Sequence, residues 1–340
     1  MKVLFLSQIV PYPPHGGVLQ RGYNLLRELG REARVHLLAF VHPDVLPTEA
    51  ARRESQAALE KFCETVEYFP LWPKASPVHR IAGLAASALS PRPFSVLAHR
   101  SAAFHRRVSK LVETKSFDLI HADTIALAQF IDQRWTIPTV LTHHNIESQL
   151  MERRAGAESG LFARIYLQRE TRKLLAYEAE MSGTFDVNVF VSQPDEKTLG
   201  ERVPGLRTAI VPNGVDVEYF TPSQVQDRPV LIYTGGMNMF ANRDAVMFFL
   251  SEIWPLIRKQ VPEVRFFAVG QDPPKELLDL ASRDSHVVVT GYVNDVRPLV
   301  RDASVYVVPL RVGGGTRLKV LDAMAMGKAM VSTSIGCEGL

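Results

Sequence analysis

A glycine-rich loop that runs into a helix is the stretch of this chain best suited to bind a phosphorylated ligand. Glycine amides are open to a ligand, and the first turn of a helix favours negative charge. Two cations lie beside the glycines, and a carboxylate one turn further on could bind sugar or ribose hydroxyls. We expect a diphosphate joined to a sugar or ribose at this site. Its residues are Gly314, Gly315, Thr316, Arg317, Lys319 and Asp322. The alternative is a glycine-rich turn with solvated basic residues, and the strand–loop–helix context favours the binding site.

A second group of polar side chains directly follows the strand-like run Pro138–Thr142. Its members are His143, His144, Asn145 and Glu147. Ligands of open α/β sheets bind beyond the carboxyl ends of the strands, so we expect a reacting group to meet these side chains. For either histidine the alternative is a helix cap or a core residue. A metal site that adds His121 and Asp123 is weaker, because the spacing matches no zinc motif.

Three further glycine turns follow strand-like runs. They are Gly16 with Gly17, Gly235 with Gly236, and Gly291 with Tyr292 and Val293. The first is not a GxGxxG fingerprint, so a plain tight turn is as well supported there as a ligand loop. The sequence contains no GxSxG nucleophile elbow and no P-loop.

Strand-like and helical runs alternate along the whole chain, which predicts parallel sheets with helices on both faces. A proline and an Asn-Gly turn at 212–214 interrupt the alternation, which then restarts at Val230–Thr234. We therefore predict two Rossmann-like α/β domains, at 1–215 and 223–340.

The composition indicates a globular protein with sizeable cores. The chain has 340 residues, of which 46% are apolar, and a net charge of +3. Two cysteines without a CxxC motif fit a reducing compartment, and no run reaches the ~18 apolar residues of a membrane span. We expect a cytoplasmic protein that does not bind nucleic acid. Residues 79–115 carry seven Lys and Arg against one Glu, interleaved with apolar residues. This pattern suggests either a peripheral contact with an anionic membrane or an ordinary solvated helical face.

The segment GGGTRLKVLDAMAMGKAMVST closely resembles the donor-binding segment of the retaining glycosyltransferases of family four, the group 1 transferases. It is most similar to the branch associated with bacterial exopolysaccharide and PEP-CTERM systems. The NGVD element at 213–216 is also typical of that family, at its domain junction. The resemblance implies the GT-B fold, in which two Rossmann-like domains face each other across a cleft. It also implies a nucleotide diphosphate sugar as donor, a glycan or lipid-linked glycan as acceptor, and no cofactor.

The resemblance also implies roles for individual residues. His144, or failing that His143, would bind the donor sugar near the reacting carbon. Gly16 and Gly17 would admit the donor phosphate or the acceptor, and the turn at Gly291 would contact the nucleobase. Two features depart from the family pattern. Asn242 stands where a lysine is usual, and of the two signature glutamates Gly314 replaces the first and Asp322 the second. Arg317 and Lys319 then become the best candidates for neutralising the diphosphate.

The resemblance implies a front-face transfer in which the acceptor hydroxyl loses its proton to the leaving phosphate. No Asp-x-Asp occurs, so no metal is expected. Two alternatives remain, a non-catalytic nucleotide-sugar-binding paralogue or assembly subunit and a nucleotide-sugar 2-epimerase. The family normally continues beyond the equivalent of Leu340, so we expect a truncated chain with an incomplete second domain.

Overall fold

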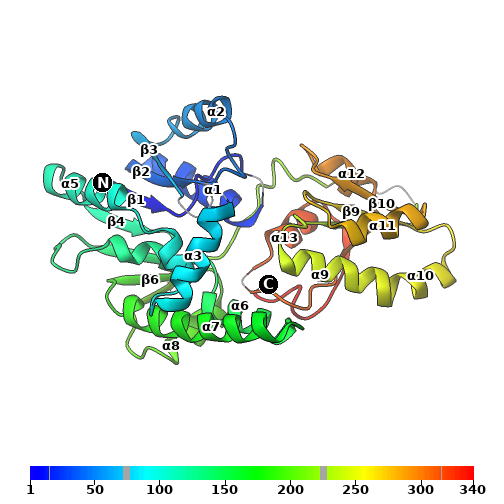
Figure 1. Cartoon of the computed structure of the whole chain (residues 1–340). Coiled ribbons are helices and arrows are strands. Elements are labelled where there is room, and N and C mark those ends of the chain that lie inside the picture. Colours follow the sequence, from blue (N-terminus) through cyan, green and yellow to red (C-terminus); the bar gives the residue numbers. More distant parts are fainter. Residues whose placement is uncertain (15, 72–76, 223–227, 315) are drawn as a thin grey trace. The chain divides into compact units, whose positions relative to one another are not determined.

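The chain folds into two compact units, Met1–Pro212 and Asn213–Leu340 (Figure 1). The computed structural model describes residues 1–14, 16–71, 77–222, 228–314 and 316–340. The sequence places the domain boundary between 215 and 223, and part of that stretch, 223–227, lies outside the described residues. Each unit is built around one parallel sheet.

The first unit has a seven-stranded sheet in the order β3-β2-β1-β4-β5-β6-β7. The strands are β1 (Lys2–Ser7), β2 (Arg34–Val41), β3 (Thr65–Pro70), β4 (Leu119–Ala122), β5 (Thr139–His143), β6 (Val187–Phe190) and β7 (Thr208–Ile210). Alternate residues of β1 enter different cores: Leu4 and Leu6 pack in one cluster and Phe5 in another. Because side chains alternate between the two faces of a strand, both faces of this sheet are buried, as predicted.

The helices of the first unit connect these strands. They are α1 (Gly17–Glu32), α2 (Glu49–Leu59), α3 (Pro77–Leu89), α4 (Phe94–Ala98), α5 (Ala102–Thr114), the 3₁₀ helix η2 (Ile125–Phe130), α6 (Glu147–Ala157), α7 (Leu161–Ser182) and α8 (Gln193–Gly200). Thr48 caps the start of α2, since its hydroxyl accepts a hydrogen bond from the amide of Ala51 at 3.1 Å.

The basic stretch 79–115 contributes more to the core than its sequence suggests. Phe104, Val108 and Leu111, the apolar stripe of α5, are almost fully buried. Phe104 stacks on Phe40, with ring centroids 4.6 Å apart. Arg107 of the same helix is bound by Glu67 at 2.6 Å. The apolar face of α5 therefore packs on the sheet and is not available to a membrane. Membrane contact through residues 79–115 stays a prediction, and the packing of α5 does not support it. Among the described residues no helix is both long and apolar enough to cross a bilayer.

The second unit has a five-stranded sheet in the order β10-β9-β8-β11-β12. Its strands are β8 (Val230–Thr234), β9 (Arg265–Val269), β10 (Val287–Gly291), β11 (Val305–Val308) and β12 (Ala329–Ser332). Its helical segments are α9 (Phe240–Phe248), the π-helical turn η3 (Phe249–Ile253), α10 (Trp254–Gln260), α11 (Lys275–Arg283), α12 (Arg297–Asp302) and α13 (Leu318–Ala325).

The sequence pattern at Asp244–Lys259 predicts one continuous helix, but in the structure this helix is interrupted. It begins earlier, at Phe240, and widens into the π-helical turn immediately before Trp254 and Pro255. Proline has no amide hydrogen to donate back along a helix, which accounts for the break at this point.

Each sheet has a point where the strand order reverses, between β1 and β4 in the first unit and between β8 and β11 in the second. Loops that leave the two central strands at such a point diverge and open a crevice for a ligand. The loops that the sequence singles out follow β4, β5, β8 and β11, at or beside these points.

Candidate functional site

Lys319, on α13, reaches the end of β8 in the second unit. Its ammonium donates to three oxygens, the Tyr233 hydroxyl at 2.8 Å, the Thr234 carbonyl at 2.8 Å and Asn242 Oδ1 at 2.9 Å. It also lies 4.2 Å from the centre of the Tyr233 ring. An ammonium has three hydrogens, so all of them are engaged. We call Tyr233, Thr234, Asn242 and Lys319 the lysine cage.

The lysine cage is closed by two further hydrogen bonds. The Tyr233 hydroxyl donates to Asn242 Oδ1 at 2.6 Å, and Asn242 Nδ2 donates to the Gly236 carbonyl at 2.9 Å. Burial, together with the nearby charge of Arg317, lowers the pKa of Lys319 to about 7. The cation at the end of β8 is thus poised to change its charge near neutral pH.

Glycine is required at the turn after β8 for reasons of space. A Cβ on Gly235 would lie 2.8 Å from Lys319 Nζ and 2.9 Å from the Asn242 side chain. A Cβ on Gly270, after β9, would lie 2.0 Å from the Gly235 carbonyl oxygen. Gly236 continues the turn as predicted. The backbone therefore comes closer to the Lys319 ammonium at this turn than it could if residue 235 had a side chain.

The glycine loop after β11 folds back on itself. Arg317 Nη1 donates to the Gly314 carbonyl, and Nη2 donates to the Ile335 carbonyl at 3.4 Å. The Thr316 hydroxyl donates to the Gly339 carbonyl at 3.3 Å. Gly315 lies outside the described residues. Arg317 precedes the first residue of α13, so the predicted helix start beside the glycines is present.

The other predicted donor residues of the second unit are Asp322 and the turn at the end of β10. Asp322 is on α13. Burial raises the pKa of Tyr306, and the nearby charge of Asp322 adds to this shift. At the end of β10, Gly291 has a φ of 69° and Tyr292 is more than half exposed. Val293 packs against the core of the unit. The ring of Tyr292 is therefore free to meet a ligand, whereas Val293 offers only its backbone.

In the first unit, Asp123 and His144 meet where β4 and β5 end. His144 Nε2 lies 3.1 Å from Asp123 Oδ1, and the Asp123 side chain is 1% exposed. Neither carboxylate oxygen has a well-aligned hydrogen bond among the described residues. The other Asp123 oxygen is 4.0 Å from where a Cβ on Gly22 would stand. A buried carboxylate without a donor is a strong acceptor for a ligand hydroxyl.

His143, the second candidate for the catalytic histidine, is a core residue. Its Nε2 lies 3.0 Å from Asn188 Oδ1, and its ring stacks on Phe190 with centroids 4.8 Å apart. Burial lowers the pKa of His143 to about 4. His121 is held similarly, 2.9 Å from the Thr142 hydroxyl and stacked on Phe5, and burial lowers its pKa to about 4. Of the predicted pair, only His144 is paired with a carboxylate at the strand ends.

Glu147 and Glu178 form a partly buried acidic pair behind His144. Burial, with the charge of Glu178, raises the pKa of Glu147 to about 7. Burial also raises the pKa of Glu178, which accepts hydrogen bonds from the amide and hydroxyl of Ser148. Glu147 is the first residue of α6, and Asn145 lies in the connection before it. A carboxyl group with a pKa near neutrality can exchange a proton at physiological pH.

The first glycine turn leads into α1 and is open on one side. Gly16 is the N-cap of α1 with a φ of 89°, and an added Cβ would meet no atom within 4 Å at Gly16 or Gly17. One turn into the helix, Arg21 donates to the carbonyls of Val211 at 2.8 Å and Pro212 at 3.2 Å. Burial lowers the pKa of Arg21, and the charge of Asp123 offsets part of this effect.

Sequence reasoning missed part of both sites. Asp123 was considered only as a metal ligand, although its place just after β4 was a usable signal. Nothing in the sequence marks Tyr233 or Arg21, because their partners are far along the chain. No group of three His, Cys, Asp or Glu side chains within the described ranges is placed to hold a metal ion.

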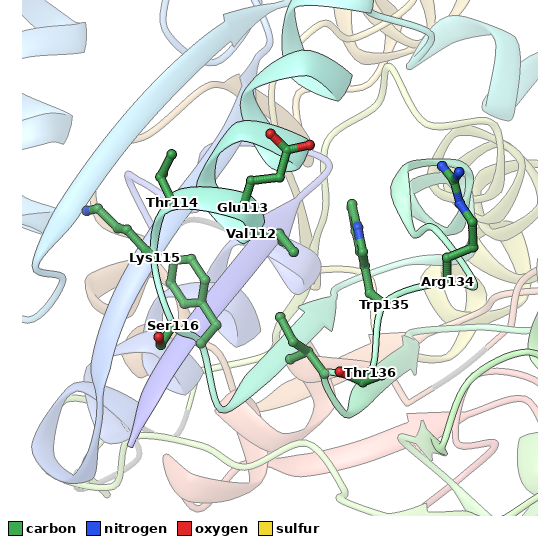
Figure 2. Close-up of a pocket in the computed structure, with 10 residues that line it drawn as sticks. Val112, Glu113, Thr114, Lys115, Ser116, Arg134, Trp135 and Thr136 are labelled. Atoms are coloured by element: carbon green, nitrogen blue, oxygen red, sulfur yellow. The ribbon is translucent and has the colours of Figure 1, made fainter.

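A pocket of about 490 Å³ opens elsewhere on the first unit (Figure 2). It lies between the end of α5 and the loop before β5, with Lys115, Arg134 and Trp135 in its wall. These residues precede β4 and β5, so the pocket is at the amino ends of the strands. The side chains of the candidate site follow the carboxyl ends, at the opposite edge of the sheet.

Comparisons with known proteins agree with the geometry. Residues 15–219 match the model described as Glycosyltransferase Family 4, and residues 228–340 match the model described as Glycosyl transferases group 1. An uncharacterized 44.6 kDa protein in the cps region of Klebsiella pneumoniae is 22% identical, over 99% of this chain and 84% of that protein.

Solved structures of similar fold cover almost the whole chain. Anabaena HepE in complex with UDP-glucose is 19% identical with a TM-score of 0.58, over 98% of this chain and 80% of that one. S. aureus TarM, in a complex that contains UDP, is 10% identical with a TM-score of 0.66, over 98% and 86%. The expected GT-B fold, with two parallel-sheet α/β domains, is confirmed. Because the first family model spans more than half of the chain, the protein belongs to Glycosyltransferase Family 4 and is a glycosyltransferase.

Proposed function

We propose that this glycosyltransferase is a retaining, metal-independent enzyme that moves a hexose from a nucleotide diphosphate sugar to a glycan or lipid-linked glycan. The observation that carries the proposal is the lysine cage, a partly buried cation beside a glycine turn at the point where the second sheet reverses its strand order. Structures of Anabaena HepE contain UDP and UDP-glucose, which supports a donor of this class. The relative from a cps region supports a role in exopolysaccharide or cell-surface polysaccharide biosynthesis.

The second unit supplies the groups that a departing nucleoside diphosphate needs. Negative charge grows on the leaving phosphate in the transition state, and a preorganised cation at that place lowers the barrier. Lys319 and Arg317 supply two cations here, and the turn at Gly235 brings no side chain of its own to the cation. Asp322 would bind ribose or sugar hydroxyls, and Tyr292 would lie against the nucleobase.

The first unit supplies the groups for sugar hydroxyls. Asp123 is buried and lacks an aligned donor, so we assign it to an incoming hydroxyl of the acceptor or the transferred sugar. His144 is oriented by Asp123 at 3.1 Å, and Glu147 lies behind it with a pKa raised to about 7 by burial. In the front-face reaction that we propose, the acceptor hydroxyl attacks from the leaving-group side and passes its proton to the departing phosphate. We place this reaction in the cytoplasm.

The test is product analysis with a panel of UDP- and GDP-hexoses and lipid-linked acceptors. Transfer with the anomeric configuration of the donor, read by NMR of the product, is the expected result. An inverted linkage would contradict the retaining mechanism. A donor epimerised at C2 would favour the 2-epimerase alternative. Donor binding without any product, across acceptors that a related enzyme uses, would favour the non-catalytic alternative.

A further inference from the structure

The first turn of α7 presents large apolar side chains to solvent. Leu161 is 59% exposed, Phe162 87% and Ile165 53%. At spacings of one and four residues they lie on one side of the helix. Three such side chains within five residues, at the end of a helix hairpin, form a patch of the kind that marks an interaction surface. We call these three residues the α7 tip.

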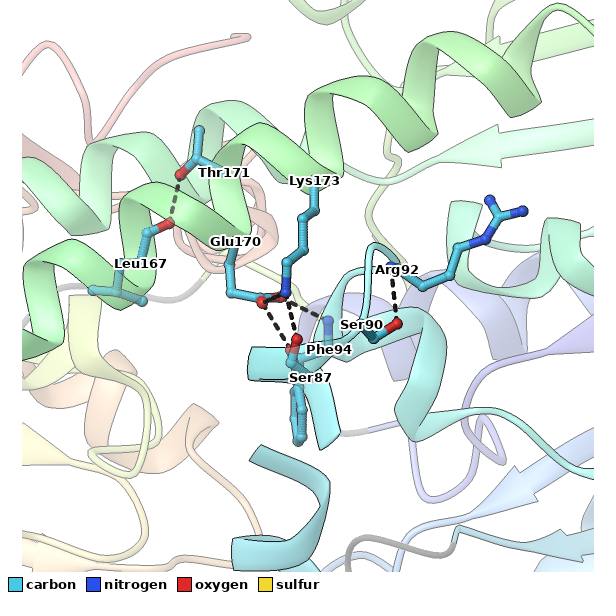
Figure 3. Close-up of polar contacts among 8 residues, drawn as sticks. All are labelled: Ser87, Ser90, Arg92, Phe94, Leu167, Glu170, Thr171 and Lys173. Atoms are coloured by element: carbon cyan, nitrogen blue, oxygen red, sulfur yellow. Dashed lines mark hydrogen bonds and ion pairs between the residues drawn. The ribbon is translucent and has the colours of Figure 1, made fainter. Parts of the chain in front are cut away.

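The α7 tip belongs to a helix that is firmly held (Figure 3). Glu170, 2% exposed, accepts hydrogen bonds from the Ser87 hydroxyl and the Phe94 amide, both at 2.7 Å. Lys173 donates to Glu170 and to the Ser87 carbonyl, both at 2.6 Å. These bonds tie α7 to α3 and α4 and fix which side of α7 faces inward. The helix therefore cannot rotate to bury the tip without breaking a buried ion pair.

Cations surround the tip. Between residues 151 and 172 the chain carries five arginines against three glutamates. Glu170 is bound by Lys173 at 2.6 Å, so its charge is compensated inside the protein. Arg164, Arg169 and Arg172 are exposed on α7 itself. Exposed aromatic and aliphatic side chains next to arginines are the pattern of a helix that lies in the interface of an anionic bilayer.

We propose that the α7 tip and its arginines dock this protein on an anionic lipid surface. The apolar side chains would enter the headgroup region while the arginines meet lipid phosphates. The proposal does not depend on the donor or on the reaction, because it rests on this surface alone. It also replaces α5 as the contact, since the apolar face of α5 packs on the sheet. Other occupants, a second copy of the chain or another protein, would have no need for a phosphate-binding rim.

The experiment is co-sedimentation of the full chain with vesicles of phosphatidylcholine, with and without phosphatidylglycerol. Wild type is expected to bind only the anionic vesicles and to be released by salt, since screening weakens its cations. Phe162→Asp should lower the partition coefficient at least about tenfold, because it replaces a ring that would enter the bilayer by a charge. Arg164→Glu should lower it as well and make the dependence on anionic lipid shallower, because one of the cations that meet lipid phosphates is lost.

The matched control is Leu256→Asp, which adds the same charge at a side chain 66% exposed on α10. It should bind anionic vesicles as wild type does, and all variants should keep the melting temperature of wild type. Equal binding of wild type to neutral and anionic vesicles, or undiminished binding of Phe162→Asp, would overturn the proposal. So would wild type that ignores vesicles but forms dimers which Phe162→Asp abolishes in light scattering, since the occupant would then be a second copy.

Discussion

Binding of a nucleotide sugar should draw a proton onto Lys319. Burial lowers the pKa of its ammonium to about 7, so about half of the molecules carry the charge at pH 7. A diphosphate beside the ammonium would favour the charged form and return the pKa toward the ordinary lysine value of about 10.4. Binding should then take up about 0.1 proton at pH 6, about 0.5 at pH 7 and about 0.9 at pH 8.

The same coupling sets how affinity depends on pH. Because a proton must be acquired on binding, affinity falls as pH rises above the pKa of the free protein. Between pH 7 and pH 9 the fall should be about fiftyfold if Lys319 starts at a pKa of about 7. The lysine cage makes the charged form possible at all, since three oxygens within 2.9 Å accept its three hydrogens.

Isothermal titration calorimetry with UDP-glucose in buffers of different ionisation enthalpy measures the uptake directly. UDP-glucose is preferred to UDP because both of its phosphates are esterified and neither titrates between pH 6 and pH 9. The slope of observed enthalpy against buffer ionisation enthalpy gives the number of protons. Lys319→Met should bind more weakly with a slope near zero. A zero slope in wild type at pH 8, or an unchanged slope in Lys319→Met, would refute the reasoning.

Other perturbations test the two sites separately. Gly235→Ala places a methyl 2.8 Å from Lys319 Nζ at a φ of 156° that disfavours a side chain, so it should weaken UDP-glucose binding about tenfold and lower the melting temperature; unchanged affinity would contradict the cage. Burial lowers the pKa values of His121 and His143 to about 4, so each should add up to about one proton to the slope with which the unfolding free energy falls as pH drops from about 6.5 to about 4. Urea titrations of His143→Gln should show a slope smaller than that of wild type by about one proton. Transfer activity should survive EDTA, and loss that Mn²⁺ restores would contradict the metal-free mechanism. Asn242→Lys should weaken UDP-glucose binding in calorimetry, because it places a like charge beside Lys319 and removes an acceptor; tighter binding would contradict this role of Asn242.

The fold could be predicted largely because its signals are local. Buried parallel strands are continuous apolar runs, and the runs Val230–Thr234 and Lys2–Leu6 are clear examples of this pattern. Glycine and proline then mark where each run ends. The prediction of one helix across Trp254 was wrong because the pattern there is helical throughout. The break depends on a single amide hydrogen that Pro255 lacks.

The candidate site residues could be predicted only where the sequence shows that they follow the end of a strand. His144 and Asp123 each follow a strand, but only the order β1-β4-β5 makes those ends neighbours. The core role of His143 depends on Asn188, 45 residues away, and no spacing reveals it. Tyr233 lies in a strand where an aromatic residue is ordinary, and its hydroxyl matters only because Lys319 arrives from 86 residues further on.

Asn242 shows why the cage must be considered as a unit. Judged by resemblance, an asparagine in place of the usual lysine removes a cation from the donor site. In the structure, Asn242 Oδ1 accepts from both Lys319 and Tyr233, and Nδ2 donates to the Gly236 carbonyl. A lysine at 242 would supply no acceptor and would bring a second positive charge to within a few ångströms of Lys319. Like charges at that distance in a poorly solvated place lower each other's pKa, so one of the two would lose its proton. The asparagine therefore removes no usable charge from the proposed site: it accepts a hydrogen bond from the one ammonium that stays charged there, and that charge acts on a nearby diphosphate through space.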